Sequence, residues 1–502
     1  MENNRPKIIG FSASLRNSRR SIENQDLIAD LKQIENVKSL VDYLKKQSKI
    51  RLDQFVDSGR KEGLPFDQIY RNLKKEKGTQ GLSNSEVALA ASLWECHNLG
   101  CEIEHVNLSD YFLETKKKKN ESLLLSKINS ADGIILSTPV YFGDRSSLSQ
   151  SFINYLHTLK EKVDFSNKVY AGLSVGAKRN GGQETTLMYQ LYDMTHLGFF
   201  GVGNDSETTS QYGGTGYAGD IGSMGDDSYG LDVCRGTGRR IARVANFLSY
   251  DTDKRVDKLK VQFWILQDKN NQAKKMIDKV FHDTYPFIEP KFIDLCNKEI
   301  VRCIACDICP THISVDEEYR CIINSKNDDF DQLHGELLDA DVIIPVVFSA
   351  KGKENIISNY QRFIERTRYL RRGDYVFSDL IVKPLIIEEV YSEENMIIRS
   401  MTSFLRHHTI LSKPLHLLLY QGETIGIEEI KADIIEKMKT FLKISAQRLL
   451  SQSTHVNNNN YKPVGYILSA EKDKEDVKLN QRQNMINKRL DKIEIQIAQR
   501  IK

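Results

Sequence analysis

The stretch Ala131–Leu156 constrains the fold of this chain more than any other. It begins with an apolar run, Gly133–Leu136, whose length and composition are those of a strand buried on both faces. A loop over residues 137–143 follows, and an amphipathic helix is predicted from about Ser147. A strand that ends in a loop and continues as a helix is the unit in which open α/β sheets place ligands. The sequence therefore predicts an α/β fold with parallel strands.

Length and composition predict several domains and exclude some partners. A chain of 502 residues is too long for one hydrophobic core. Its net charge of +3 predicts no nucleic-acid partner, and no apolar run is long enough to span a membrane. The first residues lack the pattern of a signal peptide. We therefore expect a cytoplasmic protein with neither nucleic acid nor membrane as a partner.

A loop rich in hydroxyl groups and positive charge follows the first predicted strand, Lys7–Phe11. It runs from Ser12 to Ser21 and reads SASLRNSRRS. Phosphate groups are bound by hydroxyl donors, backbone N–H groups and the positive end of a helix, so this loop is a candidate phosphate site. The alternative is a solvated basic loop.

Two more loops follow predicted strands, and the three together resemble a known family. The central loop reads STPVYFG, and the strand Lys168–Val175 leads to RNGGQETT at Arg179–Thr186. These loops resemble the phosphate loop and flavin-edge loops of the flavodoxin-like NAD(P)H-dependent FMN reductases and iron–sulfur flavoproteins. The resemblance covers residues 7–250 well and 260–425 loosely. It implies that FMN is bound by Ser12, Ser14, Arg16, Asn17, Ser21, Pro139, Val140, Tyr141, Phe142, Gly143, Arg179, Asn180, Gly181, Gly182 and Gln183.

Two features of the first 250 residues lie outside this pattern. Residues 23–85 are charge-rich with helical spacing, and they predict a helical insertion that is a lid, a contact surface or decoration. Gly214–Gly219 is formally G-x-G-x-x-G, but it lies within a predicted loop rather than between a strand and a helix. We therefore reject a dinucleotide site there and expect a flap over the flavin.

A second, weaker copy of the pattern follows. Ala340-Asp341 repeats Ala131-Asp132 before an apolar run, which suggests a duplicated unit. The corresponding first loop, 267–272, lacks hydroxyl groups and contains Asp268, so we expect no flavin in the second copy. The prediction is an α/β protein with two tandem flavodoxin-like, doubly wound parallel sheets. The domains are residues 1–250 (insertion about 23–85), 251–450, and a linker with a helical tail at 451–502, which we expect to lie on its own domain.

Four cysteines are concentrated in the second half. Cys303, Cys306, Cys309 and Cys321 have the spacing C-x2-C-x2-C-x11-C, with Pro310 after the third. Thiolates so spaced are typical of a [4Fe–4S] cluster, whereas structural zinc sites usually come as two separated pairs. We favour the cluster and keep zinc as the alternative. The basic stretch 362–372 is expected to be a solvated helix face.

The predicted function is that of a flavoprotein oxidoreductase. FMN would lie in the first domain, a [4Fe–4S] cluster in the second, and NAD(P)H or a reduced ferredoxin would supply electrons. No amino acid is expected to be the catalyst, because the flavin carries the chemistry. The resemblance further implies a homodimer with a small-molecule or protein redox partner. The alternatives are an NAD(P)H-dependent FMN or quinone reductase with a structural zinc site, and a non-enzymatic flavodoxin-like scaffold.

Overall fold

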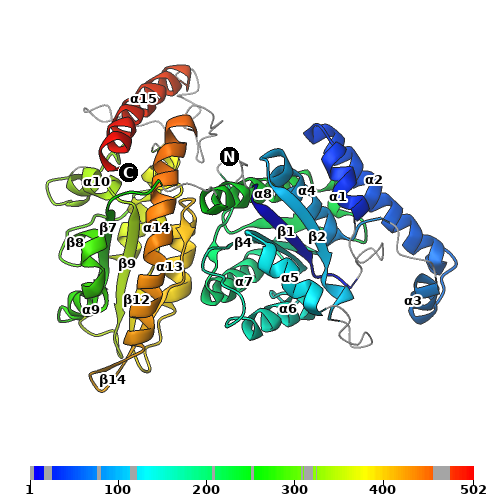
Figure 1. Ribbon diagram of the computed structural model, residues 1–502, viewed down its shortest axis with the longest axis horizontal. Coiled ribbons are helices and arrows are strands. Elements are labelled where there is room, and N and C mark those ends of the chain that lie inside the picture. The colour runs from blue at the N-terminus through cyan, green and yellow to red at the C-terminus, as the bar shows by residue number, and fades with distance from the viewer. Residues whose placement is uncertain are drawn as a thin grey trace. The chain divides into compact units, whose positions relative to one another are not determined.

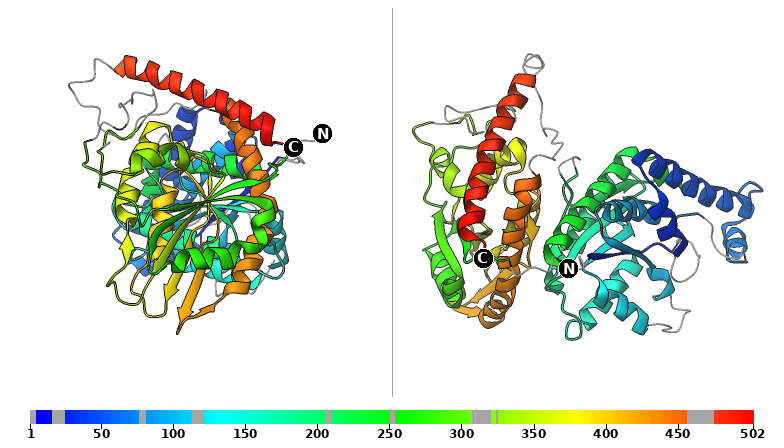
Figure 2. Two further views of the ribbon diagram at one scale, coloured as in Figure 1. Left: turned by 90° about the vertical axis from the view of Figure 1, so that its left-hand side faces the viewer. Right: turned by 45° about the horizontal axis from the view of Figure 1, so that its top comes forward.

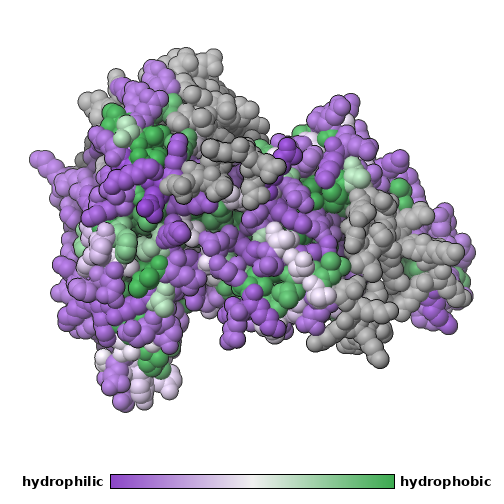
Figure 3. Space-filling model, viewed as in Figure 1, coloured by the Kyte–Doolittle hydropathy of each residue, from purple (hydrophilic) through white to green (hydrophobic). Residues whose placement is uncertain are grey.

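The chain divides into two compact units, Met1–Asp251 and Thr252–Lys502, which are described separately (Figure 1). The computed structural model describes residues 5–15, 25–75, 81–112, 121–205, 210–249, 254–306, 309, 320–323, 325–455 and 475–502. Within these ranges, no helix is both long enough and apolar enough to cross a membrane. The surface drawn in Figure 3 is mostly hydrophilic, with apolar residues in small groups.

The first unit is built on a parallel sheet with the strand order β2-β1-β3-β4, in which β4 pairs with both β5 and β6. This is the doubly wound order in which a ligand is bound where the chain switches direction, between the first and third strands. The strands are β1 Lys7–Ser12, β2 Glu102–Asn107, β3 Gly133–Pro139, β4 Val169–Gly176, β5 Phe200–Gly201 and β6 Gly214–Tyr217. The predicted α/β fold with parallel strands is confirmed.

Helices cover both faces of this sheet. The helices α4 and α8 pack together on one face, and α5, α6 and α7 lie on the other (Figure 1). Gly238 of α8 allows the close approach to α4, because a Cβ there would lie 2.2 Å from the Ser92 carbonyl oxygen. The bounds are α4 Asn84–Asn98, α5 Glu121–Ser130, α6 Ser147–Thr158, α7 Gln183–Leu197, α8 Ser228–Ser249, and the 3-10 helices η2 Leu108–Asp110 and η3 Met224–Asp226.

The predicted insertion consists of helices. It contains α1 Gln25–Gln33, α2 Val37–Phe55, η1 Val56–Arg60 and α3 Phe66–Lys75. The helix α2 buries Leu40, Leu44 and Ser48 and contacts η3. Gly222, beside η3, has a φ of 70°, and a Cβ there would lie 2.3 Å from the Ser48 carbonyl oxygen. The insertion therefore packs its backbone against the segment that leads into α8.

The segment expected to be a flap is part of the sheet instead. Residues 214–217 form β6, which pairs in parallel with the second half of β4. The short β5 pairs with the first half, so the fifth strand position is shared by two segments. The glycines of this stretch fit the strand because side chains there would collide: a Cβ on Gly214 would lie 2.3 Å from Leu173 Cδ2.

The second unit has the same strand order at its centre. Its sheet runs β8-β7-β9, then β11 and β12, then β13 and β14, all in parallel, with β15 antiparallel to β14 and β10 antiparallel to the end of β7. Its strands fan out in the twist that parallel sheets normally have (Figure 2). The strands are β7 Leu259–Asp268, β8 Ile288–Asp294, β9 Val342–Ser349, β10 Ile357–Ser358, β11 Ile381–Val382, β12 Leu385–Glu389, β13 Ile410–Leu411, β14 Leu415–Tyr420 and β15 Glu423–Ile425.

Buried charge anchors one of the helices of this unit. Lys383 and Pro384 lie between β11 and β12. The ammonium group of Lys383 is fully buried and donates to Asp433 of α14 at 2.6 Å. The C-terminal helix α15 contacts α14, and the chain end then bridges back to Val256. The helices are α9 Gln272–Phe281, η4 His282–Phe287, α10 Phe330–Leu338, α11 Tyr360–Arg366, α12 Arg368–Asp374, α13 Met396–Leu405, α14 Ile427–His455 and α15 Glu475–Arg500.

Candidate active site

The predicted phosphate loop begins at the carboxyl end of β1. Ser12 is buried, and its hydroxyl donates to Asn107 Oδ1 at 2.6 Å, so its oxygen accepts from His105 Nε2 at 2.9 Å. Burial lowers the pKa of His105 to about 3, which keeps the ring neutral. Ser14 is also buried. The remaining predicted phosphate ligands, Arg16, Asn17 and Ser21, lie outside the described residues.

The start of this loop is tied to the central loop after β3. The Ser146 hydroxyl donates to the Ala13 carbonyl at 2.7 Å, and the same oxygen accepts from the Ser149 N–H, which caps α6. The Ser146 N–H donates to Thr138 Oγ1 at 3.0 Å. One serine therefore joins the described start of the phosphate loop, the central loop and α6 at the same edge of the sheet.

The central loop presents aromatic side chains at a tight turn. Tyr141 and Asp144 exchange two backbone hydrogen bonds, of 2.8 and 2.9 Å. Phe142 and Gly143, between them, have φ values of 52° and 79°, the signature of a type I′ turn. The Phe142 side chain is fully exposed and that of Tyr141 is more than half exposed, while Pro139 and Val140 are partly buried. The turn thus holds two aromatic rings at the surface.

The third loop, Arg179–Gln183, touches the central loop directly. Gly182 has a φ of 97°, and a Cβ there would lie 2.6 Å from Gly143 Cα. The buried Gln183 amide maintains the shape of this loop, because its Oε1 accepts from the Gly181 N–H at 2.8 Å and its Nε2 donates to the Lys178 and Gly216 carbonyls. A contact between Gln183 and a flavin stays a prediction. Asn180 is exposed.

Arg179 is oriented by groups that the sequence did not indicate. Its guanidinium forms an ion pair with the buried Asp227 and lies 5.4 and 5.2 Å from the ring centres of Tyr217 and Tyr229. Asp227 also accepts from the Tyr217 N–H at 2.7 Å and from the Gly230 N–H at 3.0 Å, so it joins β6 to the first turn of α8. The only sequence signal for it is an acidic residue just before a helix.

The described start of the loop after β1 and the loops after β3 and β4 therefore meet at the carboxyl edge of one parallel sheet. The described residues suit a flavin ring there, because two exposed aromatic rings, backbone of a tight turn and a half-exposed guanidinium lie on adjoining loops. A flat ring system needs such close backbone approach, and glycines at positions 143, 181 and 182 permit it. The structure brings together the predicted ring-binding residues of both loops, while their contacts with FMN stay predictions.

The four predicted metal ligands, unlike the predicted ring-binding residues, are not brought together among the described residues. Among the residues that the structure describes, no three His, Cys, Asp or Glu side chains lie close enough together to hold a metal ion. The Ala305 N–H donates to Cys303 Sγ at 3.4 Å. Burial raises the pKa of Cys321. Four-cysteine coordination is thus not seen in this arrangement.

Cys296 lies in the turn after β8, where it is bonded to the sheet rather than to the cysteine segment. Its thiol donates to the Ile265 carbonyl at 3.5 Å, and its N–H donates to Asp294 Oδ1. Burial raises its pKa to about 12, so the thiol stays protonated at neutral pH.

Comparisons with known proteins point to flavin-dependent oxidoreductases. The model of the family of NADPH-dependent FMN reductases matches residues 78–205. An iron–sulfur flavoprotein of Methanocaldococcus jannaschii is 37% identical over 125 residues, 25% of this chain and 64% of the relative. An iron–sulfur flavoprotein of Methanosarcina thermophila is 27% identical over 186 residues, 36% of this chain and 86% of the relative. An NAD(P)H dehydrogenase (quinone) of Acidovorax ebreus is 30% identical over 135 residues, 25% of this chain and 68% of the relative.

The loops and these relatives define a class, the FMN-dependent NAD(P)H oxidoreductases with a flavodoxin-like sheet. The chain belongs to the NADPH-dependent FMN reductase family within it, which confirms the family identified from the sequence. The match of the family model, residues 78–205, lies in the first unit, and the alignment with the M. jannaschii relative spans just under two thirds of that protein.

Proposed function

We propose that the first unit binds one FMN and that the protein transfers electrons from NAD(P)H to a small-molecule or protein acceptor. One observation carries this proposal. The loops after β3 and β4 contact each other at Gly143 and Gly182, and the described start of the loop after β1 is bonded to them at the same sheet edge. Relatives named NAD(P)H dehydrogenase (quinone) favour a quinone as the acceptor.

The side chains would divide the work of binding. Ser14 and the residues that follow it would hold the phosphate, and backbone of Pro139–Gly143 and Gly181–Gly182 would border the ring. Tyr141 and Phe142 would cover a ring face and exclude water from it. FMN supplies the hydride and single-electron chemistry when bound. The protein would provide the binding site for the phosphate and the ring, and the charges around the ring.

Arg179 would place a positive charge at the polar edge of the ring. Asp227 and the two tyrosine rings hold this guanidinium while leaving it half exposed, so it is pre-organised for a ligand. A positive charge near the ring favours the reduced, anionic form of a flavin. Arg179→Met should therefore weaken FMN binding about tenfold, since hydrogen bonds to charged groups contribute ~1.5–3 kcal/mol, and should lower the reduction potential.

The test is a titration of the flavin-free full chain with FMN, followed by flavin fluorescence. Lys162→Met is the matched control, because Lys162 is an exposed cation beyond the end of α6. Retention of wild-type affinity and potential by Arg179→Met would remove this residue from the site. A chain that binds no FMN would contradict the proposal itself and would favour the scaffold alternative.

We infer a [4Fe–4S] cluster at Cys303, Cys306, Cys309 and Cys321 from their spacing and from relatives named iron–sulfur flavoproteins. Among the described residues no three thiols lie close enough together to hold a metal ion, so this inference rests on the spacing and on the names of the relatives. Anaerobic purification should give about four iron and four sulfide per chain, and Cys306→Ser should lower both. Stoichiometric zinc without sulfide would instead support the zinc-stapled reductase.

We further propose that the second unit is a diverged flavodoxin-like copy. Its strand order, second-first-third-fourth-fifth in chain order, is that of the first unit. The end of its first strand differs, because Asp268 Oδ1 accepts from the Lys269 and Ala273 N–H groups and so caps α9. A carboxylate at the position of the phosphate would repel FMN, which supports a stoichiometry of one FMN per chain. A homodimer stays a proposal.

A further inference from the structure

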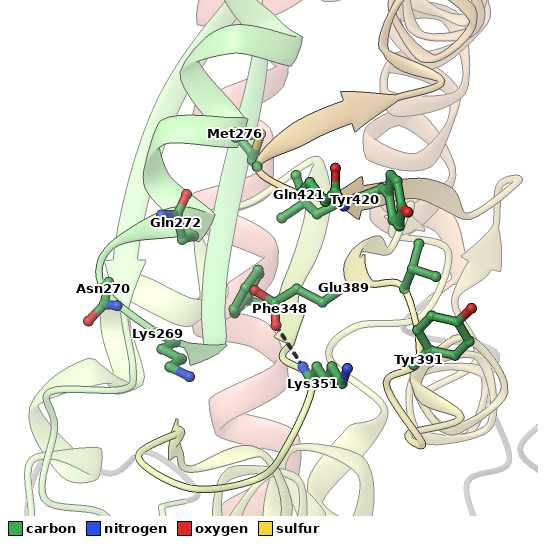
Figure 4. A pocket seen from close by; sticks show the side chains of 13 residues that line it. Lys269, Asn270, Gln272, Met276, Phe348, Lys351, Glu389, Tyr391, Tyr420 and Gln421 are labelled. Carbon is green, nitrogen blue, oxygen red and sulfur yellow. Dashed lines mark hydrogen bonds between the residues drawn. The ribbon is translucent and has the colours of Figure 1, made fainter.

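The second unit contains a pocket at the carboxyl edge of its sheet (Figure 4). Its volume is about 540 Å³, and it lies where the loops after β7, β9, β12 and β14 come together. In open α/β sheets this is the position of the ligand site, and pockets of 300–1,000 Å³ are the usual size for small ligands. The lining residues are Lys269, Asn270, Gln272, Met276, Phe348, Lys351, Glu389, Val390, Tyr391, Leu419, Tyr420, Gln421 and Gly422.

One side of the pocket is cationic. Lys269 follows β7 and Lys351 follows β9, and the two side chains lie on the same side in Figure 4. Within the described part of the chain, neither ammonium group forms an ion pair, and Lys351 Nζ instead lies 5.6 Å from the ring centre of Tyr391. Glu389 is the acidic residue of the lining, and its Oε2 accepts from the Lys351 backbone N–H at 2.7 Å. With two lysines and one glutamate, the lining carries a net charge of +1, and the lysine ammonium groups are available to bind an anion.

The opposite side is apolar and aromatic. Met276 of α9 lies there beside Tyr420 and Gln421 of the β14–β15 turn (Figure 4), and buried Phe348 lies between the two sides. Gln421 and Gly422 both have positive φ values, so the two-residue turn is fixed as type I′. Thr424 of β15 contacts Met276 of α9, with Oγ1 3.8 Å from Sδ. The aromatic side of the pocket is thus built on ordered backbone.

The pocket differs from a flavin phosphate site. Asp268 Oδ1 accepts from the Ala273 N–H in the first turn of α9 and places a carboxylate there, so an anion would have to be held by lysine side chains rather than by the helix N-terminus. Two lysines on one side and aromatic rings on the other suit a ligand with one anionic end and one flat, apolar end. Lysine binds carboxylate and phosphate alike as a point charge.

We propose that this pocket binds a planar aromatic molecule with a single anionic group, a carboxylate or a monophosphate. Lys269 and Lys351 hold the anionic end, and the flat end lies over Phe348 between Met276 and Tyr420. The proposal concerns a second site and goes beyond the binding of FMN in the first unit.

The experiment is calorimetric titration of the FMN-saturated full chain with 2-naphthoate and, in a second arm, with adenosine 5′-monophosphate. The proposal expects saturable binding of at least one of them with a Kd below about 1 mM. The arm that binds distinguishes a carboxylate from a phosphate ligand. The neutral analogues 2-naphthalenemethanol and adenosine should bind at least tenfold more weakly, because they lack the anion.

Variants then locate the binding. Lys351→Met and Lys269→Met should each weaken it about tenfold, since each removes one charged contact. Lys353→Met is the control, because Lys353 is exposed close by but does not line the pocket. All three should bind FMN as the wild type does. The proposal is overturned if neither anion binds, if the neutral analogues bind equally well, or if the two lining variants match the control.

Discussion

Arg366 should be among the most costly residues to replace in the second unit. Its side chain and that of Asp328 are both fully buried, with Nη1 2.8 Å from Oδ2. The guanidinium also donates to the Val301 carbonyl at 2.9 Å and to the Ile323 carbonyl at 3.2 Å, and it lies 4.5 Å from the ring centre of Phe330. This one side chain thus ties together the two ends of the segment that carries the cysteines.

The magnitude follows from what Arg366→Met leaves behind. The substitution keeps much of the apolar bulk but leaves the Asp328 carboxylate buried without its counter-charge, and breaking a buried pair in this way costs ~3–5 kcal/mol. Replacing both partners, Arg366→Met with Asp328→Asn, should cost less than the sum of the single changes, because no uncompensated charge remains. The double-mutant cycle should therefore give a favourable coupling energy between Arg366 and Asp328.

The assay is urea unfolding followed by tryptophan fluorescence. The chain has two tryptophans, and in a Trp94→Phe background the buried Trp264 reports on the second unit alone. Arg362→Met is the control, since Arg362 is exposed on the same helix. A loss below about 1 kcal/mol for Arg366→Met, the range of an exposed ion pair, would refute the reasoning.

Two further predictions concern the first unit. The free energy of unfolding should fall as the pH is lowered from about 6.5 to 3, by up to ~1.4 kcal/mol per pH unit. The reason is that His105 binds a proton in the unfolded chain, whereas its pKa in the folded chain is lowered to about 3. In denaturant titrations His105→Gln should flatten this pH dependence, and His282→Gln, at an exposed histidine, should not. Gly222→Ala should lower the thermal midpoint more than Gly63→Ala: both residues have positive φ, but only at position 222 does a Cβ meet backbone, the Ser48 carbonyl. Equal effects of the two alanines would show that the helical insertion does not depend on this contact.

Much of the first unit could be predicted because its signals are local. Buried strands appear as apolar runs, so the ends of β1, β3 and β4 could be predicted, and the described parts of the three candidate loops begin there. The partners that orient these loops could not be predicted in the same way. Asp227 lies 48 residues from Arg179, and it is brought there by the pairing of β6 with β4 and by its hydrogen bond from the Tyr217 N–H.

The errors have physical causes as well. Gly214–Tyr217 was expected to be a flap because glycines usually indicate loops, but here they are needed where a strand packs closely on Leu173 and Cys234. The basic stretch 362–372 was expected to be a solvated face, yet Arg366 is fully buried, because its carboxylate partner lies 38 residues earlier in the chain. Spacing alone does not show which one of several arginines finds a buried counter-charge.

The most direct test of the flavin seat compares two glycines at the ends of α7. Gly182 and Gly198 both have positive φ values, but a Cβ at 182 would lie 2.6 Å from Gly143 Cα, whereas at 198 the nearest atom is 3.7 Å away. Titration of the flavin-free chain with FMN should give one equivalent bound by the wild type and by Gly198→Ala, and at least about tenfold weaker binding by Gly182→Ala. Absence of saturable FMN binding by the wild type, or equal affinity of the two variants, would contradict the account.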